Sequence, residues 1–355
     1  MSPAGGIPGS PGQLEAMIEA LQDRVLPVKP LAGEDFDPMT ASQQELIEVG
    51  LPPRPAVADP GVLQAWRKVV GPLPLKILAW RLSQLDSTLD YRVGAARGPA
   101  SGRSGTSRNW SGIVVTARDD ATRPGATMFD QVFGSWTVPM PTLPADHAAD
   151  AVYRCSTWIG IDGHRRLSSS LPQIGTTLVV EVVGGQPRPP RIEVWWQWWL
   201  REHFFGPVPI ANFAVDFGDE IAAALTAIDP RLVRLNLRNV TRNDPPHVVS
   251  IAAPTVIIGP GMNASAAARG LTAEWIAERP TALNDTWLHP LPDFGAVTFT
   301  GCYAIESGGA LRTLAAGRNV RMVARQQSPA RVAVLSRPDP PPHASALDRT
   351  IRFVG

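Results

Sequence analysis

The sequence predicts an all-β domain from about Arg108 to the C-terminus, preceded by a mostly helical N-terminal extension. After Arg108, short runs rich in Val, Ile, Thr and Trp alternate with clusters of Gly, Pro, Asn and Asp. Many short strands separated by turn residues are typical of an antiparallel sandwich or barrel. Nine of the eleven tryptophans lie in this part, which indicates a thick core or an aromatic-lined groove between two sheets. The 355 residues also exceed the ~100–200 of a single domain, so a second unit or an extension is expected.

Helix-start and helix-stop signals predict the elements of the extension. Ser42 and Glu45 form a capping box that opens a short helix, and Gly50 ends it. Asp59 followed by Pro60 is typical of an N-cap and a first helical position, ahead of a second helix. A further helix is expected over residues 13–26, where apolar side chains share one helical face: Leu14, Met17, Ile18, Leu21 and Val25.

A glycine-rich segment separates the two parts of the chain. Residues 95–107 (AARGPASGRSGTS) are small and polar, which indicates a flexible linker. We therefore expect an extension over residues 1–94, a linker over 95–107 and a β domain over 108–355. Strands are expected at ten runs of the β domain: 113–116, 135–138, 157–161, 177–183, 192–198, 233–239, 248–251, 273–276, 296–299 and 320–323.

Composition and charge exclude several classes of protein. The 33 basic and 32 acidic side chains nearly cancel, and the basic residues form no run, so neither nucleic acid nor a membrane is an expected partner. No apolar run approaches the ~18–20 residues of a membrane span. The first residues show neither a basic nor a long apolar region, so no secretory signal is visible. Cys155 and Cys302 are too few for a disulfide scaffold; they either pair or stay as buried thiols.

Motifs of several familiar enzyme classes are absent from the sequence. It contains no G-x-S-x-G, H-E-x-x-H, P-loop or G-x-G-x-x-G pattern. The six histidines are scattered, and none lies four residues from another, so surface or turn positions are better expected for them than metal ligation. No metal site is predicted.

A set of polar residues lies within aromatic, strand-like runs. Gln173 lies in SLPQIGT, Glu193 and Gln197 in RIEVWWQWW, and Glu274 and Glu278 in AEWIAE. Residues four apart in a strand point to the same face, so each of the last two pairs shares one side of its strand. The simplest interpretation is that all these side chains face water. Against it, the four tryptophans of RIEVWWQWW leave neither face of that strand plainly polar, and a carboxylate or amide among indoles indicates a lined cleft.

Taken in order along the chain, these segments resemble the glutamic peptidase family, the eqolisins. No single motif is specific, but the ordered set is, and it covers nearly all of the β domain. The resemblance implies a concanavalin-like β-sandwich of two antiparallel sheets. The segments that carry it are RNWSG (108–112), GSWTVP (134–139), STWIGIDG (156–163), LPQIGT (171–176), EVWWQWW (193–199), AEWIAERP (273–280), LPDFGAVTFTGC (291–302) and VRMV (320–323).

The resemblance implies that Glu278 is the general base of a peptidase and that Gln173 is its partner. A carboxylate can take a proton from an attacking water and return it to the leaving amine. A primary amide transfers no proton, but its NH2 group can donate to the developing oxyanion, which is worth roughly 10²–10³ in rate. Such a pair needs neither a metal nor a covalent nucleophile, so no cofactor is expected.

The same resemblance implies supporting or substrate-binding roles for Trp110, Trp158, Asp162, Glu193 and Gln197. Plain core positions are an equal alternative for the two tryptophans. Gln197 stands where the family has a glutamate, which removes a charge beside the pair, and Glu193 replaces an aspartate. Pro172 stiffens the approach to Gln173.

We therefore expect an acid-acting, pepstatin-insensitive endopeptidase that cleaves polypeptides as a monomer. Two alternatives stay open: a catalytically inactive sandwich that binds carbohydrate or peptide in a Trp-lined groove, and a relative that lost activity through Gln197. Members of the family are typically exported, whereas no signal is visible here, so localisation stays open. The extension is expected to be either a prosegment that covers the cleft until the linker is cut, or a fixed helical accessory domain.

Overall fold

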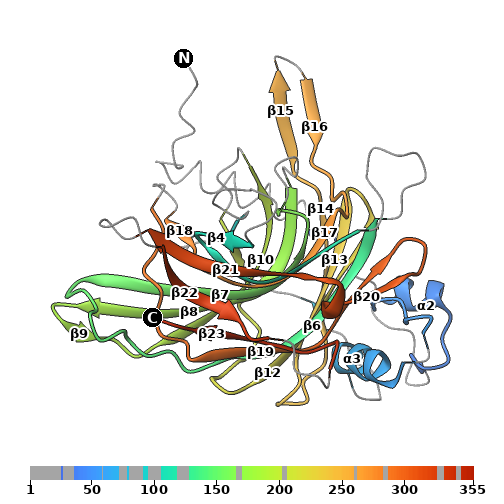
Figure 1. The fold of residues 1–355 in the computed structure, drawn as a ribbon. Coiled ribbons are helices and arrows are strands. Elements are labelled where there is room, and N and C mark those ends of the chain that lie inside the picture. The colour runs from blue at the N-terminus through green and yellow to red at the C-terminus, as the bar shows by residue number, and fades with distance from the viewer. Residues whose placement is uncertain are drawn as a thin grey trace.

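The computed structural model describes residues 25–26, 36–57, 59–71, 78–79, 91–94, 105–117, 128–164, 170–201, 206–259, 262–282, 287–325, 332–340 and 345–355. The main strands form two antiparallel sheets that pack face to face as a sandwich (Figure 1). The predicted all-β fold is therefore confirmed.

Eight long strands make the first sheet: β6 (Phe129–Thr137), β12 (Glu220–Asp229), β13 (Leu232–Asn239), β14 (His247–Ala252), β19 (Ala296–Glu306), β21 (Arg318–Arg325), β22 (Val332–Pro338) and β23 (Arg349–Phe353). Their order is β14–β13–β12–β6–β19–β23–β22–β21. Short strands extend it: β1 (Val25–Leu26) and β2 (Leu78–Ala79) beside β14, β20 (Leu311–Thr313) beside β19, and β4 (Thr106–Ser107) beside β21.

The second sheet is built on five long strands: β5 (Trp110–Thr116), β7 (Ala151–Ile161), β8 (Ser170–Val183), β10 (Arg191–Leu200) and β17 (Thr272–Glu278). Their order is β10–β8–β7–β17–β5, with β9 (Gln186–Pro187) beside β8 and β11 (Val208–Pro209) beside β10. Because β21 pairs with β22 in the first sheet and with β5 in the second, it joins the two sheets along one edge.

Three smaller elements accompany the two sheets. The hairpin of β15 (Thr255–Gly259) and β16 (Met262–Ser265) projects from the sandwich, as Figure 1 shows. A short pair joins β3 (Tyr91–Arg92) to β18 (Thr281–Ala282), and a 3₁₀ turn, η1 (Leu314–Ala316), precedes β21. No helix in the described part of the chain is long and apolar enough to cross a membrane.

Alternation along the strands places tryptophans on both faces of the second sheet. On β10, Trp196 and Trp198 are buried in the main core between the sheets, whereas Trp195 belongs to a separate cluster on the outer face. On β17, Trp275 lies in the main core and Ile276 in the outer cluster. This period of two explains why neither face of RIEVWWQWW is plainly polar in the sequence.

Two helices of the extension form where the sequence predicts them. Helix α2 (Gln43–Glu48) begins at the capping box of Ser42 and Glu45, and Gly50 takes a φ of 92° just beyond its end. Helix α3 (Pro60–Val70) begins at Asp59, whose carboxylate accepts from the backbone N–H of Gly61 and Val62. Both helices pack on the outer face of the first sheet, in a cluster with β6, β12 and β19.

Other predicted elements are only partly described. The helix expected over 13–26 lies outside the described residues except for Val25–Leu26, which form a strand. Residues 95–104 of the expected linker are also outside them, and 106–107 form β4. All ten expected strand runs overlap strands, usually longer ones. Only the expected run 135–138 extends past its strand, because β6 ends at Thr137.

Candidate active site

The register of five strands collects the polar residues on the outer face of the second sheet. Glu278, the last residue of β17, lies opposite Trp110 of β5 and Ser156 of β7. Two residues further along β17, Ile276 lies opposite Trp158 of β7. Since opposite residues in antiparallel strands share a face, both indole side chains point to the side of the Glu278 carboxyl group.

Gln173 lies on the same face, nearer the other edge of the sheet. On β8 it is opposite Gly160 of β7 and Gln197 of β10. Two residues further along β8, Gly175 is opposite Trp158 of β7. A Cβ atom at Gly175 would lie 2.5 Å from the Cβ of Trp158. Glycine at this position therefore lets the Trp158 indole lie across the sheet between Gln173 and Glu278.

The Glu278 carboxyl group is completely buried and accepts four hydrogen bonds. Its Oε1 accepts from the Asn109 side-chain amide and from the Gly94 backbone N–H, each at 3.0 Å. Its Oε2 accepts from the indole N–H of Trp110 and of Trp158, each at 3.0 Å. The Ser107 hydroxyl donates to Asn109 Oδ1 at 2.9 Å, which turns the amide so that its NH2 group faces the carboxylate.

Burial and these donors act in opposite directions on the pKa of Glu278. Burial is the largest cause and raises the pKa to about 8, whereas the donors from Gly94, Asn109, Trp158 and Trp110 lower it. A carboxyl group in such a place holds its proton more tightly than an exposed one, which also makes its ionised form a stronger base.

The Gln173 side chain is buried and held by its amide group. Its Nε2 donates to the carbonyl oxygen of Val93 at 3.1 Å and to Gln197 Oε1 at 3.4 Å. Among the described residues, none donates to Gln173 Oε1. The carbonyl oxygen is thus able to accept a further hydrogen bond, for example from a water molecule.

Four residues of the extension lie directly on this site. Residues 91–94, which we call the cover segment, pair with β18 through Tyr91 and Arg92. Tyr91 and Val93 are buried, and the Gly94 carbonyl oxygen accepts from the Trp110 indole at 2.8 Å. The peptide group between Val93 and Gly94 bridges the two candidate residues, because its C=O accepts from Gln173 and its N–H donates to Glu278.

That bridge limits the separation of the candidate pair. A single peptide group with C=O and C–N bonds of ordinary length joins Gln173 Nε2 to Glu278 Oε1, so these atoms are no more than roughly 9 Å apart. The pair therefore faces one short stretch of backbone, although the two residues come from non-neighbouring strands.

The other expected site residues occupy different positions. Gln197 contacts Gln173, and Trp110 and Trp158 donate to Glu278, as described above. Glu193 accepts a hydrogen bond from the Tyr91 hydroxyl at 2.7 Å. The Asp162 carboxylate accepts from the backbone N–H groups of residues 269–271, so all of its described hydrogen bonds hold that loop, and its substrate-binding role stays a prediction.

Sequence reasoning did not single out three contributors to the site. Asn109 stood within the quoted motif RNWSG, and its position beside Trp110 was the available signal. Val93 and Gly94 carry no motif at all, and their contacts with the pair span 80 and 184 positions of sequence.

Neither a metal site nor a disulfide is found in the described parts of the chain. Over those residues, no group of three or more His, Cys, Asp or Glu side chains is arranged to hold a metal ion. Cys155 and Cys302 are both buried as free thiols, which decides between the two alternatives left open by the sequence.

Comparison with known proteins gives one family and a set of similar folds. The sequence profile of the Peptidase A4 family matches residues 108–337. No curated protein sequence matches. A crystal structure of scytalido-glutamic peptidase with a transition state analog inhibitor is similar in fold, with a TM-score of 0.50 and 19% identity over 70% of this chain and 98% of that chain.

Two further solved structures are more distant. SCP-B, a member of the eqolisin family in a complex with the tripeptide Ala-Ile-His, has a TM-score of 0.47 and 19% identity, over 70% of this chain and 98% of its own. Aspergilloglutamic peptidase from Aspergillus niger has a TM-score of 0.42 and 23% identity, over 57% of this chain and 99% of its own.

Proposed function

Because the chain belongs to the Peptidase A4 family, the glutamic peptidases, we propose that Glu278 and Gln173 hydrolyse peptide bonds through an activated water molecule. Glu278 takes a proton from the water as the water oxygen bonds to the substrate carbonyl carbon. Gln173 donates from Nε2 to the carbonyl oxygen, which becomes an oxyanion. Glu278 then returns the proton to the nitrogen as the C–N bond breaks, leaving a carboxylic acid and an amine.

The observation that carries this proposal is the position of the Val93–Gly94 peptide group. Its carbonyl oxygen accepts from the amide that would stabilise an oxyanion, and its N–H donates to the carboxylate that would protonate a leaving amine. A substrate peptide bond bound in the same way would meet both groups in the roles that hydrolysis requires.

The surroundings of Glu278 also favour the role of general base. Three side-chain N–H donors from Asn109, Trp110 and Trp158 fix the carboxylate and oppose the effect of burial on its pKa. Departure of the cover segment would admit water to the carboxylate and reduce the burial that raises this pKa. The ionised base would then be populated at lower pH than in the covered state.

The same contacts favour a prosegment over a purely fixed accessory domain. In the covered state, Gly94 N–H occupies Glu278 Oε1 together with Asn109, so the two lone pairs of that oxygen are both used. Water cannot donate a proton to this oxygen until the cover segment leaves. We therefore propose that the full chain is latent and that acid conditions, with cleavage between about Gly94 and the end of the linker, release activity.

Gln197 does not by itself argue for an inactive relative. Its Oε1 accepts from Gln173 Nε2, so the Gln197 side chain helps to orient the amide group of Gln173.

The alternative of a module that only binds peptide is also disfavoured. A site that only binds peptide has no need for a buried carboxyl group fixed by three side-chain donors next to an amide that faces the same peptide group.

Release of peptides from denatured casein across pH 2–7, with pepstatin present, tests the proposal. The full chain should cleave at acid pH after preincubation, and a new N-terminus should appear between Gly94 and Ser107. Glu278→Gln should lose activity by at least roughly 10²-fold, and Gln173→Ala by roughly 10²–10³-fold. Glu48→Gln, on the exposed side of α2, is the matched control and should cleave like the unmodified chain. Full activity in either site variant would exclude the dyad.

A further inference from the structure

The pairing of the cover segment with β18 determines which of its peptide bonds faces the candidate pair, Gln173 and Glu278. Tyr91 and Arg92 pair with Ala282 and Thr281 of β18, so the segment lies as an added strand. Its Val93–Gly94 peptide group faces Gln173 and Glu278. If this is the bond the dyad would cut, Tyr91 is the third residue on its N-terminal side.

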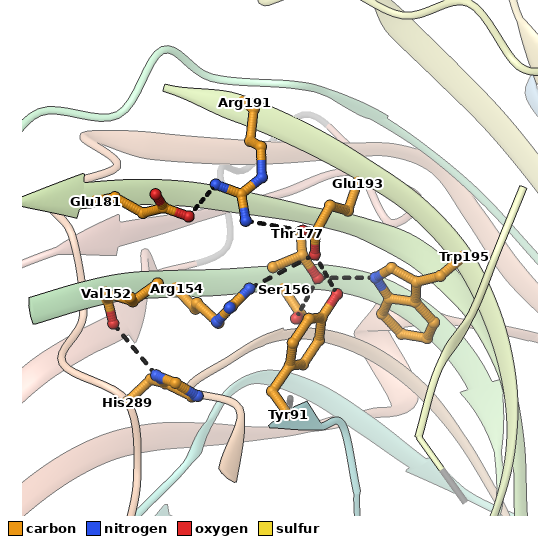
Figure 2. A network of polar contacts seen from close by, with 10 residues as sticks. All are labelled: Tyr91, Val152, Arg154, Ser156, Thr177, Glu181, Arg191, Glu193, Trp195 and His289. Carbon is orange, nitrogen blue, oxygen red and sulfur yellow. Dashed lines mark hydrogen bonds and ion pairs between the residues drawn. The ribbon is translucent and has the colours of Figure 1, made fainter. Parts of the chain in front are cut away.

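The Tyr91 side chain is buried, and three polar side chains surround its hydroxyl and its ring (Figure 2). Its hydroxyl donates to Glu193 Oε2 at 2.7 Å. The guanidinium carbon of Arg154 lies 4.5 Å from the centre of the phenol ring, in the position of a cation–π contact. The imidazole of His289 meets the ring edge-on, with centroids 6.5 Å apart.

These partners are held by the β-sandwich itself. Glu193 lies 3.3 Å from an Arg191 guanidinium nitrogen and 3.6 Å from one of Arg154. His289 Nδ1 lies 3.2 Å from the carbonyl oxygen of Val152, on the same strand as Arg154. The site therefore does not depend on the cover segment for its shape and would remain if that segment left.

A second layer fixes the floor of the site beside the ring (Figure 2). The Thr177 hydroxyl accepts from the Trp195 indole at 2.8 Å and lies 2.7 Å from the Ser156 hydroxyl. Thr177 is opposite both Ser156 and Glu193 in the sheet, so β7, β8 and β10 each contribute one of these neighbours. Side chains locked in this way form a rigid recognition site rather than an adaptable one.

We propose that this site, which we call the Tyr91 site, is a substrate-specificity site that selects tyrosine at the third position before the cleaved bond. The proposal rests on the proposed function and names a feature of its substrates. An aromatic ring is required by the Arg154 contact, and a hydroxyl donor is required by the Glu193 carboxylate. A lysine at this position would bring a second cation against Arg154, and an alanine would leave the site unfilled.

Tyrosine should be favoured over phenylalanine because of the single hydroxyl. Phenylalanine keeps the ring contacts but removes the charge-assisted hydrogen bond to Glu193, and sites built around such a bond reject the analogue that lacks it. Glu193 is in part exposed and also lies near two arginines, so the discrimination should be roughly 10-fold, at the lower end of what a bond to a charged group gives.

Synthetic peptides with the sequence of residues 89–98 (LDYRVGAARG) test the proposal, using the acid-activated full chain. The matched peptides carry Phe, Lys or Ala in place of Tyr. We expect cleavage between Val and Gly, with kcat/KM for the Tyr peptide roughly 10-fold above that for Phe and higher still above Lys and Ala. Glu193→Ala should bring the Tyr and Phe peptides to the same kcat/KM, and Glu193→Gln, which keeps an acceptor oxygen, should restore part of the preference.

Equal cleavage of the Tyr and Phe peptides, or an unchanged ratio in Glu193→Ala, would overturn the Tyr91 site while leaving the dyad intact. Cleavage that persists in Glu278→Gln would instead overturn the proposed function. If no peptide is cut, a double-mutant cycle on the full chain at neutral pH still decides the site. Tyr91→Phe should lower the urea midpoint of the unmodified chain but not that of Glu193→Ala. Equal shifts in both backgrounds would overturn it.

Discussion

The protonation state of Glu278 in the folded chain can be tested without a substrate. Burial raises the pKa of this carboxyl group to about 8, so the folded chain keeps its proton at pH 7 while the unfolded chain loses it. Unfolding at pH 7 should therefore release about one proton from Glu278. Glu274 is also completely buried, and burial raises its pKa well above the ordinary value, so it should release another.

The same protons determine how the free energy of unfolding changes with pH, in direction and in size. A folded state that binds more protons than the unfolded state loses stability as the pH rises. Between pH 6.5 and 8, Glu278 alone should lower the free energy of unfolding by about 1.5 kcal/mol. This window avoids Asp130 and Asp162, whose pKa is raised by burial to about 6, and His247, whose pKa is lowered by burial to about 4.

The assay counts protons directly. The chain is unfolded in unbuffered guanidinium chloride at pH 7, and the base needed to restore the pH is measured for the unmodified chain and for Glu278→Gln. The variant should release about one proton fewer, and its urea midpoint should fall less steeply between pH 6.5 and 8. Glu48→Gln, an exposed glutamate, controls for the loss of a carboxyl group. Equal proton release from Glu278→Gln and the unmodified chain would refute a protonated, buried Glu278.

Three further outcomes are expected. In Gly94→Ala, a Cβ atom would lie 2.4 Å from the Trp199 indole nitrogen, so the cover segment should be displaced and the full chain should cleave peptides at once, without the lag of the unmodified chain. Trp158→Phe removes one of the four donors to Glu278, so the acid limb of the kcat/KM profile should move up by roughly one pH unit; an unmoved limb would show that the indole does not stabilise the base. Asp162→Ala leaves three loop N–H groups without their acceptor and should cost about 2–4 kcal/mol in urea unfolding, whereas a change below 1 kcal/mol would contradict its role in holding residues 269–271.

The sequence predicted which polar residues share a face but not which face carries the site. The period of two correctly paired Glu193 with Gln197 and Glu274 with Glu278. Tryptophans lie on both sides of β10, so hydrophobicity could not distinguish the core side from the outer side. Only the register with the neighbouring strands, which depends on contacts distant in sequence, assigns the outer face to the glutamates.

Strand β12 shows a different limit of prediction from sequence. Its run EIAAALTAID is rich in alanine, which is uncommon in strands, and no strand was expected there. Yet β12 is central in the first sheet, between β6 and β13. Ala222 and Ala224 lie on its outer face in the cluster formed with α3, so small side chains leave room for the helix to approach. Tertiary packing, not intrinsic strand preference, selected these residues.

The helical part and the cover segment of the extension differ in how they are held, which bears on whether the extension is a prosegment or an accessory domain. The helical part buries large apolar side chains such as Leu46, Trp66 and Val69 against the first sheet. It is further fixed by hydrogen bonds from Asn236 and Arg238 to backbone carbonyl groups beside α2 and in α3. Apolar burial of this kind does not depend on the protonation of a carboxyl group.

The cover segment buries Tyr91 and Val93 in the outer apolar cluster, and it also makes polar contacts with the candidate site residues. Its backbone bonds to Glu278 and Gln173, and Tyr91 bonds to Glu193. Protonation of Glu278 weakens the acceptor that holds Gly94, and because burial raises the pKa of this group to about 8, the proton is already bound at pH 7. The packing of the helices does not depend on it. The extension therefore need not be wholly a prosegment or wholly an accessory domain. Its helices have the physical character of a fixed layer on the first sheet. Its four-residue cover segment has the character of a removable inhibitor on the second sheet.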